Sequence, residues 1–297
     1  METLSAMERL FSAPLPERTE SYTPIAHKVI DDKTREILQD MGFTLTTSKY
    51  NSSTDGMLGQ CQYNIQYGND TEMGLMVAWQ NSYNKLVSFK YAVGAHVMVC
   101  SNGMVAGDLG AYRRKHTGTA DQEAFEIIRN YLSSAKTIFE KLIADREHLK
   151  QINLTPTRMA ELMGKMFIEN EIITSTQINI MKREMYNPTY DYGVPKHNAW
   201  ALYNFATHAF KEDSPRSWMK RHIDLHDFFG KEFALPMPSE PSVIQTSLFT
   251  DEVPTEQPSP FKTDPVEEQF VIEEYEVVEE VKEEPKKESF IDFLDDF

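Results

Sequence analysis

Two stretches of this chain combine positive charge with aromatic rings, a combination that suits nucleic acid. The first combines the consecutive residues Tyr112, Arg113, Arg114, Lys115 and His116 with Lys90 and Tyr91, which precede them on a predicted strand. The second contains Arg216, Trp218, Lys220 and Arg221. Cations bind the phosphate backbone of a single strand and rings stack on its bases, so both stretches are candidate DNA contacts. The alternative is that they are ordinary solvated surfaces, and the sequence does not show whether the two stretches converge.

Candidate catalytic and metal-binding residues are few. A nucleophilic cysteine needs a base and a lowered pKa, and Cys100 has only His96 and His116 near it in sequence. The simpler interpretation is that Cys100 ends a core strand. His222 and His226 stand four residues apart, a spacing that can share a metal on a helix, but no third ligand is evident. We therefore expect a protein that is not an enzyme and that has no cofactor and no metal, with Cys100 or the histidine pair as the enzymatic alternative.

The C-terminal segment differs sharply in composition from the rest of the chain. Residues 231–297 hold 19 acidic and 5 basic residues, a net charge of −14, whereas residues 1–230 carry −2 of the total −16. The same segment contains 8 of the 15 prolines. Such a composition buries too little apolar surface to offset the entropy of ordering the chain. We predict an N-terminal arm at 1–22, a folded body at 23–230 and a disordered acidic tail at 231–297.

The tail contains two candidate linear motifs. The stretch "QTSLF" resembles the peptide by which many bacterial replication proteins dock on the sliding clamp, with Gln245, Ser247, Leu248 and Phe249 as the contacts. The final stretch "FIDFLDDF" resembles the acidic tips of single-stranded-DNA-binding proteins. Its candidate partner-binding residues are Phe290, Asp292, Phe293, Leu294, Asp295, Asp296 and Phe297. An acidic tail also mimics nucleic acid, so it could compete for the basic surface of its own body.

The body that must position these residues has the pattern of an α+β fold. One helix is expected from Thr23 to Gly42, with Pro24 in its first turn. Short runs rich in Val, Tyr, Phe and Thr follow between residues 43 and 99 and predict an antiparallel meander sheet. Helical periodicity returns after Gly118, with one long helix to about Lys150 and further helices near residues 155, 175, 197 and 215. With two cysteines, and with no signal peptide or apolar run of about 18 residues, we expect a cytoplasmic protein with no membrane segment.

Four segments of the body carry a family resemblance. They are Asn81-Ser82, Cys100 to Met104, Arg113 to His116, and the "AWALYN" segment from Ala199 to Asn204. In order and spacing these resemble the phage- and plasmid-borne family called domain of unknown function 932, over residues of about 40 to 230. The resemblance implies an origin on a mobile element and transfers little function.

Together these patterns predict a phage protein of DNA replication or recombination, at work in the cytoplasm of a bacterial host. Its body would bind single-stranded DNA, could form a homo-oligomer and could promote strand annealing. Its tail would recruit the sliding clamp and other replication proteins. The rival hypothesis is a DNA-mimicking or clamp-docking inhibitor of host replication or defence, whose body would not bind DNA.

Overall fold

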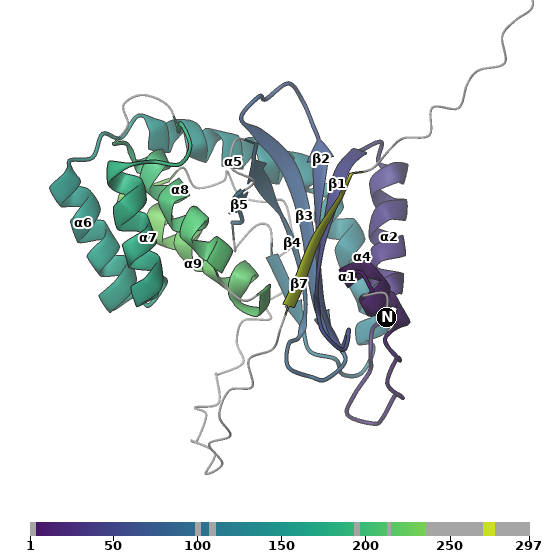
Figure 1. Ribbon diagram of the computed structural model, residues 1–297. Helices are drawn as coiled ribbons and strands as arrows, with labels where there is room; N and C mark the ends of the chain where they lie inside the picture. The colour runs from purple at the N-terminus through teal and green to yellow at the C-terminus, as the bar shows by residue number, and fades with distance from the viewer. Residues whose placement is uncertain are drawn as a thin grey trace, which may run out of the picture.

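A computed structural model of the chain describes residues 4–98, 102–106, 111–192, 197–212, 215–235 and 270–276, the last as backbone. Two helices, a sheet and a group of helices follow one another in the chain (Figure 1). The N-terminal helices are α1 (Ala6–Ser12) and α2 (His27–Asp40). The strands are β1 (Thr44–Ser53), β2 (Leu58–Gln66), β3 (Met73–Ser82), β4 (Phe89–Val97), β5 (Asn102–Met104), β6 (Ala111–Arg114) and β7 (Phe270–Glu276). The later helices are α4 (Ala120–Ser133), α5 (Ala135–Lys150), α6 (Pro156–Gly164), α7 (Ser175–Tyr186), α8 (Ala199–Ala209) and α9 (Pro215–Phe233), with a π-helical turn at Lys165–Glu169 and a 3₁₀ turn at Phe210–Glu212.

The sheet confirms the expected antiparallel meander. Strands β1 to β4 are consecutive antiparallel neighbours, and the order across the sheet is β5-β4-β3-β2-β1-β7, with β6 also paired to β4. Helices α2 and α4 lie on one side of the sheet in Figure 1, and α8 and α9 lie on the other. The α+β class predicted from the sequence is therefore confirmed.

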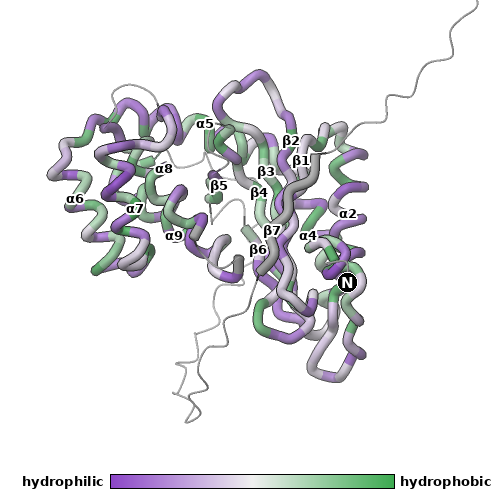
Figure 2. Tube along the Cα trace, in the orientation of Figure 1, coloured by the Kyte–Doolittle hydropathy of each residue, from purple (hydrophilic) through white to green (hydrophobic). Residues whose placement is uncertain are grey.

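One face of the sheet, here called the aromatic face, carries Tyr50, Tyr63, Trp79 and Tyr91, all almost fully buried. The Tyr50 and Tyr63 hydroxyls donate to the Asp31 carboxylate of α2 at 2.7 and 2.5 Å, and the Trp79 indole N–H donates to the Tyr63 oxygen at 2.8 Å. This buried network fixes α2 on the sheet. The outward turns of α2 are hydrophilic in Figure 2, as expected for an amphipathic helix.

The helix boundaries differ from the sequence prediction in three places. Helix α2 begins at His27, because Thr23 donates its amide to His116 and its hydroxyl to Gly118 instead of capping the helix. The predicted arm contains α1, which begins with a capping box between Ser5 and Glu8. A second helix therefore precedes the sheet.

The long helix predicted to reach Lys150 is two helices, α4 and α5, which meet at Ser134. The hydroxyls of Ser133 and Ser134 both donate to the Asn130 carbonyl, at 2.7 and 3.4 Å. Serine hydroxyls that bond back to the preceding turn compete with the backbone ladder, and such serine pairs are a known site of helix breaks.

Strand β7 is the largest difference from the sequence prediction. Residues 270–276 fall in the segment expected to be disordered, yet they pair antiparallel with β1 from Phe270 opposite Ser53 to Glu276 opposite Thr47. An edge strand such as β1 exposes a row of backbone donors and acceptors, and an extended segment of the same chain can satisfy them. None of the helices in the described ranges is long and apolar enough to span a bilayer.

Candidate nucleic-acid interface

Five polar residues form one row across the second face of the sheet, here called the polar face. The register pairs Asn51 with Gln60, Gln60 with Gln80, Gln80 with Lys90, and Lys90 with Arg113. Directly opposed residues point to the same face, so the row crosses β1, β2, β3, β4 and β6. It begins with uncharged amides on β1 to β3 and ends with two cations on β4 and β6.

The neighbouring row explains how a helix can lie beside these cations. The register places Lys49, Gln62, Ala78, Ala92 and Ala111 across the same five strands. The alanines and Met76 form a small apolar cluster with Met219 of α9, against which Trp218 also packs. Small side chains on β3, β4 and β6 therefore seat the first turns of α9 on the polar face.

Docking of α9 brings the two basic stretches of the sequence together. Partial burial lowers the pKa of Lys90, and the positive charges of Arg113, Lys220 and Arg216 lower it further. Arg113, Arg216 and Lys220 are exposed, and Lys220 also forms an ion pair with Asp224 at 2.5 Å. Lys90 and the three cations that act on it come from three elements, β4, β6 and α9, and are here called the basic cluster. Such a cluster favours an anionic ligand.

Several predicted DNA contacts lie away from the basic cluster. Tyr91 is fully buried on the aromatic face, so it is a core residue and the prediction that it contacts DNA is wrong. Tyr112 opposes Tyr91 in the register and packs against the Tyr131 ring of α4, with the centroids 6.2 Å apart. Arg114, two residues further on β6, donates to Glu123 at 2.8 Å. Alternation along β6 thus sends Tyr112 and Arg114 to the opposite face from Arg113.

His116 and Arg221 also have structural roles in place of the predicted ones. His116 is buried with its ring centroid 5.7 Å from that of Tyr22, and burial lowers its pKa. Arg221 donates to the Ile172 carbonyl at 2.7 Å and to the Gln177 side chain at 2.9 Å, which ties α9 to α7. Lys115 is exposed just after β6.

The histidine pair does not share a site. His222 is buried against Trp218 and Phe210, at ring-centroid distances of 4.7 and 5.3 Å, and burial lowers its pKa to about 3. His226 instead faces Asp145 of α5, with Nε2 3.4 Å from the carboxylate. Among the described residues, no group of three or more His, Cys, Asp or Glu side chains could hold a metal. Cys100 and the tail motifs Gln245–Phe249 and Phe290–Phe297 lie outside the described residues.

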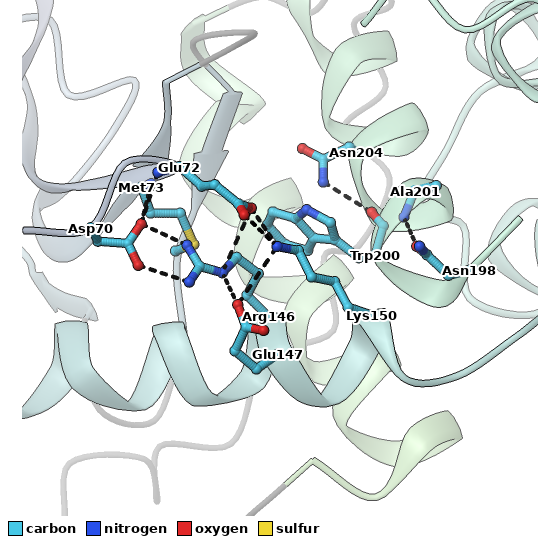
Figure 3. Close-up of polar contacts among 10 residues, drawn as sticks. All are labelled: Asp70, Glu72, Met73, Arg146, Glu147, Lys150, Asn198, Trp200, Ala201 and Asn204. Carbon is cyan, nitrogen blue, oxygen red and sulfur yellow. Dashed lines mark hydrogen bonds and ion pairs between the residues drawn. The ribbon is translucent and has the colours of Figure 1, made fainter. Parts of the chain in front are cut away.

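A second charged cluster joins the β2–β3 turn to α5 (Figure 3). The Arg146 guanidinium donates to both Asp70 oxygens at 2.7 Å, and its Nε donates to Glu147 at 2.8 Å. Lys150 pairs with Glu72 at 2.5 Å. The cations of this second cluster are paired with its carboxylates, so we assign the cluster a structural role. In the basic cluster, by contrast, the charges that lower the pKa of Lys90 are all cations.

Sequence reasoning missed the polar residues of β1 and β2. Along β2, Gln60, Gln62 and Asn64 alternate with Cys61, Tyr63 and Ile65, which lie in the core. That period of two is the signal of a strand with one polar face, and it could have identified the face of the sheet on which the basic cluster lies. What it could not show is that Asn51 and Gln60 on this face are buried.

A search of curated proteins and a search of solved structures found no match to this chain. A family model described as Domain of unknown function (DUF932) matches residues 14–227. The match spans strands β1 to β6 and helices α2 to α8 with most of α9, and it contains the whole basic cluster. The chain therefore belongs to the DUF932 family.

Proposed function

We propose that this protein binds single-stranded DNA with the basic cluster at one side of the polar face of its sheet, as a phage protein of replication or recombination. The observation that carries the proposal is the basic cluster, in which Arg113, Arg216 and Lys220 surround Lys90 closely enough to act on it. The repulsion that they exert on Lys90 is relieved when phosphates neutralise them, so an anionic backbone is the ligand that this arrangement favours. Trp218 lies beside the cluster, half-buried on β3 and β4, and offers a ring edge to a base.

The acidic C-terminal segment completes the proposal. In it the "QTSLF" stretch from Gln245 to Phe249 would dock on the sliding clamp, and the stretch from Phe290 to Phe297 would recruit another replication protein in the host cytoplasm. With a net charge of −14 over residues 231–297, this segment would also compete with DNA for the basic cluster.

Fluorescence anisotropy with a labelled oligonucleotide tests the proposal. The full-length chain is titrated at two salt concentrations, beside the double variant Lys90→Gln with Arg113→Gln. The matched control is Lys136→Gln with Arg129→Gln, which removes two exposed cations from α5 and α4. We expect salt-sensitive binding that the first double variant weakens at least tenfold and that the control retains. Equal affinity of the two double variants would contradict a DNA site at Lys90 and Arg113.

A further inference from the structure

We infer that Gly103 of β5 is a positioning residue for the basic cluster, because its lack of a side chain lets α9 lie close enough to the sheet for the two cations of α9 to act on Lys90. The inference deepens the proposed function and rests on it for the role in DNA binding. The position of α9 can also be measured without DNA, so the two claims can be tested separately.

Strand β5 is the part of the sheet that α9 reaches beyond β4. In Figure 1, β5 lies between β4 on one side and the helices α8 and α9 on the other. The register pairs Gly103 with His96 of β4, six residues after Lys90 on the same strand. Alternation along β4 places Lys90 and His96 on one face, so Gly103 belongs to the polar face.

The ring of Trp218 occupies the place that a side chain at residue 103 would need. A Cβ atom on Gly103 would lie 2.8 Å from Cζ2 of Trp218, well inside the separation of about 3.5 Å at which carbon atoms pack. The same Cβ would lie 3.5 Å from Cε1 of His222 and 3.6 Å from Cε of Met76. Any larger side chain at residue 103 must therefore displace the indole, or displace α9, which carries it.

Further contacts hold the Trp218 ring in this place. The indole packs against the His222 ring, with the centroids 4.7 Å apart, and against the small apolar cluster that contains Met219. The ring of His222 is buried and is also hydrogen-bonded to the backbone of Gly103. Because three consecutive contacts of α9 meet at this point, a side chain on Gly103 should shift the helix and not the indole alone.

Strand β5 is fixed on its other sides, so it cannot yield in place of α9. The Asn102 side chain donates to the Asn204 carbonyl of α8 at 3.3 Å. The backbone of β5 pairs with β4 from Asn102 to Met104. A displacement caused at residue 103 is therefore taken up by α9.

A shift of α9 at Trp218 moves both of its cluster cations. Arg216 and Lys220 stand two residues before and after Trp218, which is about 3 Å along the helix axis in each direction. Lys90 and Arg113 belong to β4 and β6 and stay on the sheet. Displacement of α9 would therefore divide the basic cluster into two halves.

Salt-dependent DNA binding by the full-length chain tests the inference. Gly103→Val is compared with Gly164→Val, which adds the same side chain to a glycine of α6 where a Cβ meets no atom within 4 Å. Affinity for a labelled twelve-nucleotide strand is measured across a salt series, with and without the double change Arg216→Gln and Lys220→Gln. Circular dichroism and urea unfolding check that each variant folds, and the milder Gly103→Ala is used if Gly103→Val does not.

We expect Gly103→Val to flatten the slope of log affinity against log salt by about 1.4, because two phosphate contacts of about 0.7 each are lost. Adding Arg216→Gln and Lys220→Gln to Gly103→Val should change the slope no further, since these cations have already moved away. The pKa of Lys90, measured by NMR without DNA, should rise in Gly103→Val and stay at the parent value in Gly164→Val. A residue that served only the stability of the fold would change neither quantity.

An unchanged pKa of Lys90 in Gly103→Val would overturn the inference. An unchanged salt slope in this variant, where the parent chain binds, would overturn it as well. If the parent chain does not bind DNA, the proposed function fails, and the pKa of Lys90 alone decides whether Gly103 positions α9.

Discussion

Lys90 on β4 and Arg113 on β6 are register partners, so two cations stand side by side on the polar face of the sheet. Like charges directly opposite one another destabilise a sheet, and partial burial adds a desolvation cost for Lys90. Proteins keep such arrangements where function needs them, at the expense of stability. The pair is therefore the feature on which the proposed DNA site most depends.

Removing the Lys90 charge should weaken DNA binding without lowering the stability of the fold. Because burial and three cations lower the pKa of Lys90, its charged form is disfavoured in the folded state. We expect Lys90→Met to keep the free energy of unfolding within about 0.5 kcal/mol of the parent value or to raise it, and to weaken DNA binding. Urea unfolding and anisotropy on the same sample measure both quantities. A large loss of stability would mean that Lys90 is a structural residue.

The Asp70–Arg146 pair should matter for stability and not for DNA binding, the opposite of Lys90. Arg146 is buried, and Asp70 accepts two 2.7 Å bonds from it that join the β2–β3 turn to α5 (Figure 3). We expect Asp70→Asn to cost about 3 kcal/mol in urea unfolding, because it leaves a buried guanidinium without its main partner. DNA binding by the folded variant should be unchanged. Asp40→Asn, at the exposed end of α2, is the control and should be neutral.

The same pair predicts how stability falls in acid. Although partial burial opposes ionisation, the bonds from Arg146 and from the Met73 and Glu72 amides lower the pKa of Asp70 from 3.8 to about 2. A carboxyl with a lowered pKa stabilises the fold fully above the unfolded value, and this contribution is lost as pH falls from about 3.8 to about 2. Asp70→Asn should therefore remove part of the acid dependence of unfolding in that window. An unchanged acid profile would contradict the assigned pKa.

Two buried histidines should lower the free energy of unfolding at pH values above the range in which Asp70 titrates. Burial lowers the pKa values of His27 and His222 from 6.5 to about 3, so the unfolded chain binds more protons than the folded chain between these values. Stability must then rise with pH through this window. At pH 5 each histidine should cost up to about 2 kcal/mol relative to pH 7.5. His222→Gln should reduce the difference between urea midpoints at the two pH values, and an unchanged difference would show that His222 does not titrate as assigned.

Strand β7 makes a prediction about association. Residues 270–276 pair with β1, so a chain that ends at Leu235 would expose the β1 edge. An unpaired edge strand templates pairing with another chain, so we expect this truncation to associate in a concentration-dependent way. A chain that ends at Glu276 keeps β7 and should resemble the full-length chain. Light scattering coupled to size exclusion measures the mass of each truncated chain. Identical masses for the two chains at all concentrations would contradict the prediction that β7 protects the β1 edge.

Local pattern predicted much of this fold. The meander from Phe43 to Val97 follows from short runs of β-forming residues, and the helix starts at Pro156, Ser175 and Pro215 follow from their caps and prolines. What failed was decided by contacts distant in sequence. Thr23 bonds the segment after β6, and β7 depends on a free strand edge more than two hundred residues earlier.

The candidate site was predicted in part for the same reason. Charge and ring content selected Lys90, Arg113, Arg216 and Lys220, which the fold brings together. The same criterion also selected Tyr91 and Arg221, because composition does not distinguish a residue on the polar face from its neighbour in the core. Strand alternation would have separated Arg113 from Tyr112 and Arg114, once the register of β6 against β4 was known.

The salt dependence of DNA binding, with and without the basic cluster, tests the central claim most directly. Affinity for a labelled twelve-nucleotide strand is measured across a salt series for the full-length chain and for the variant with Lys90, Arg113, Arg216 and Lys220 all changed to Gln. Four lost phosphate contacts should flatten the slope of log affinity against log salt by about 2.8, at about 0.7 per contact. If the slope stays the same, or if the parent chain does not bind at all, the polar face is not a nucleic-acid interface.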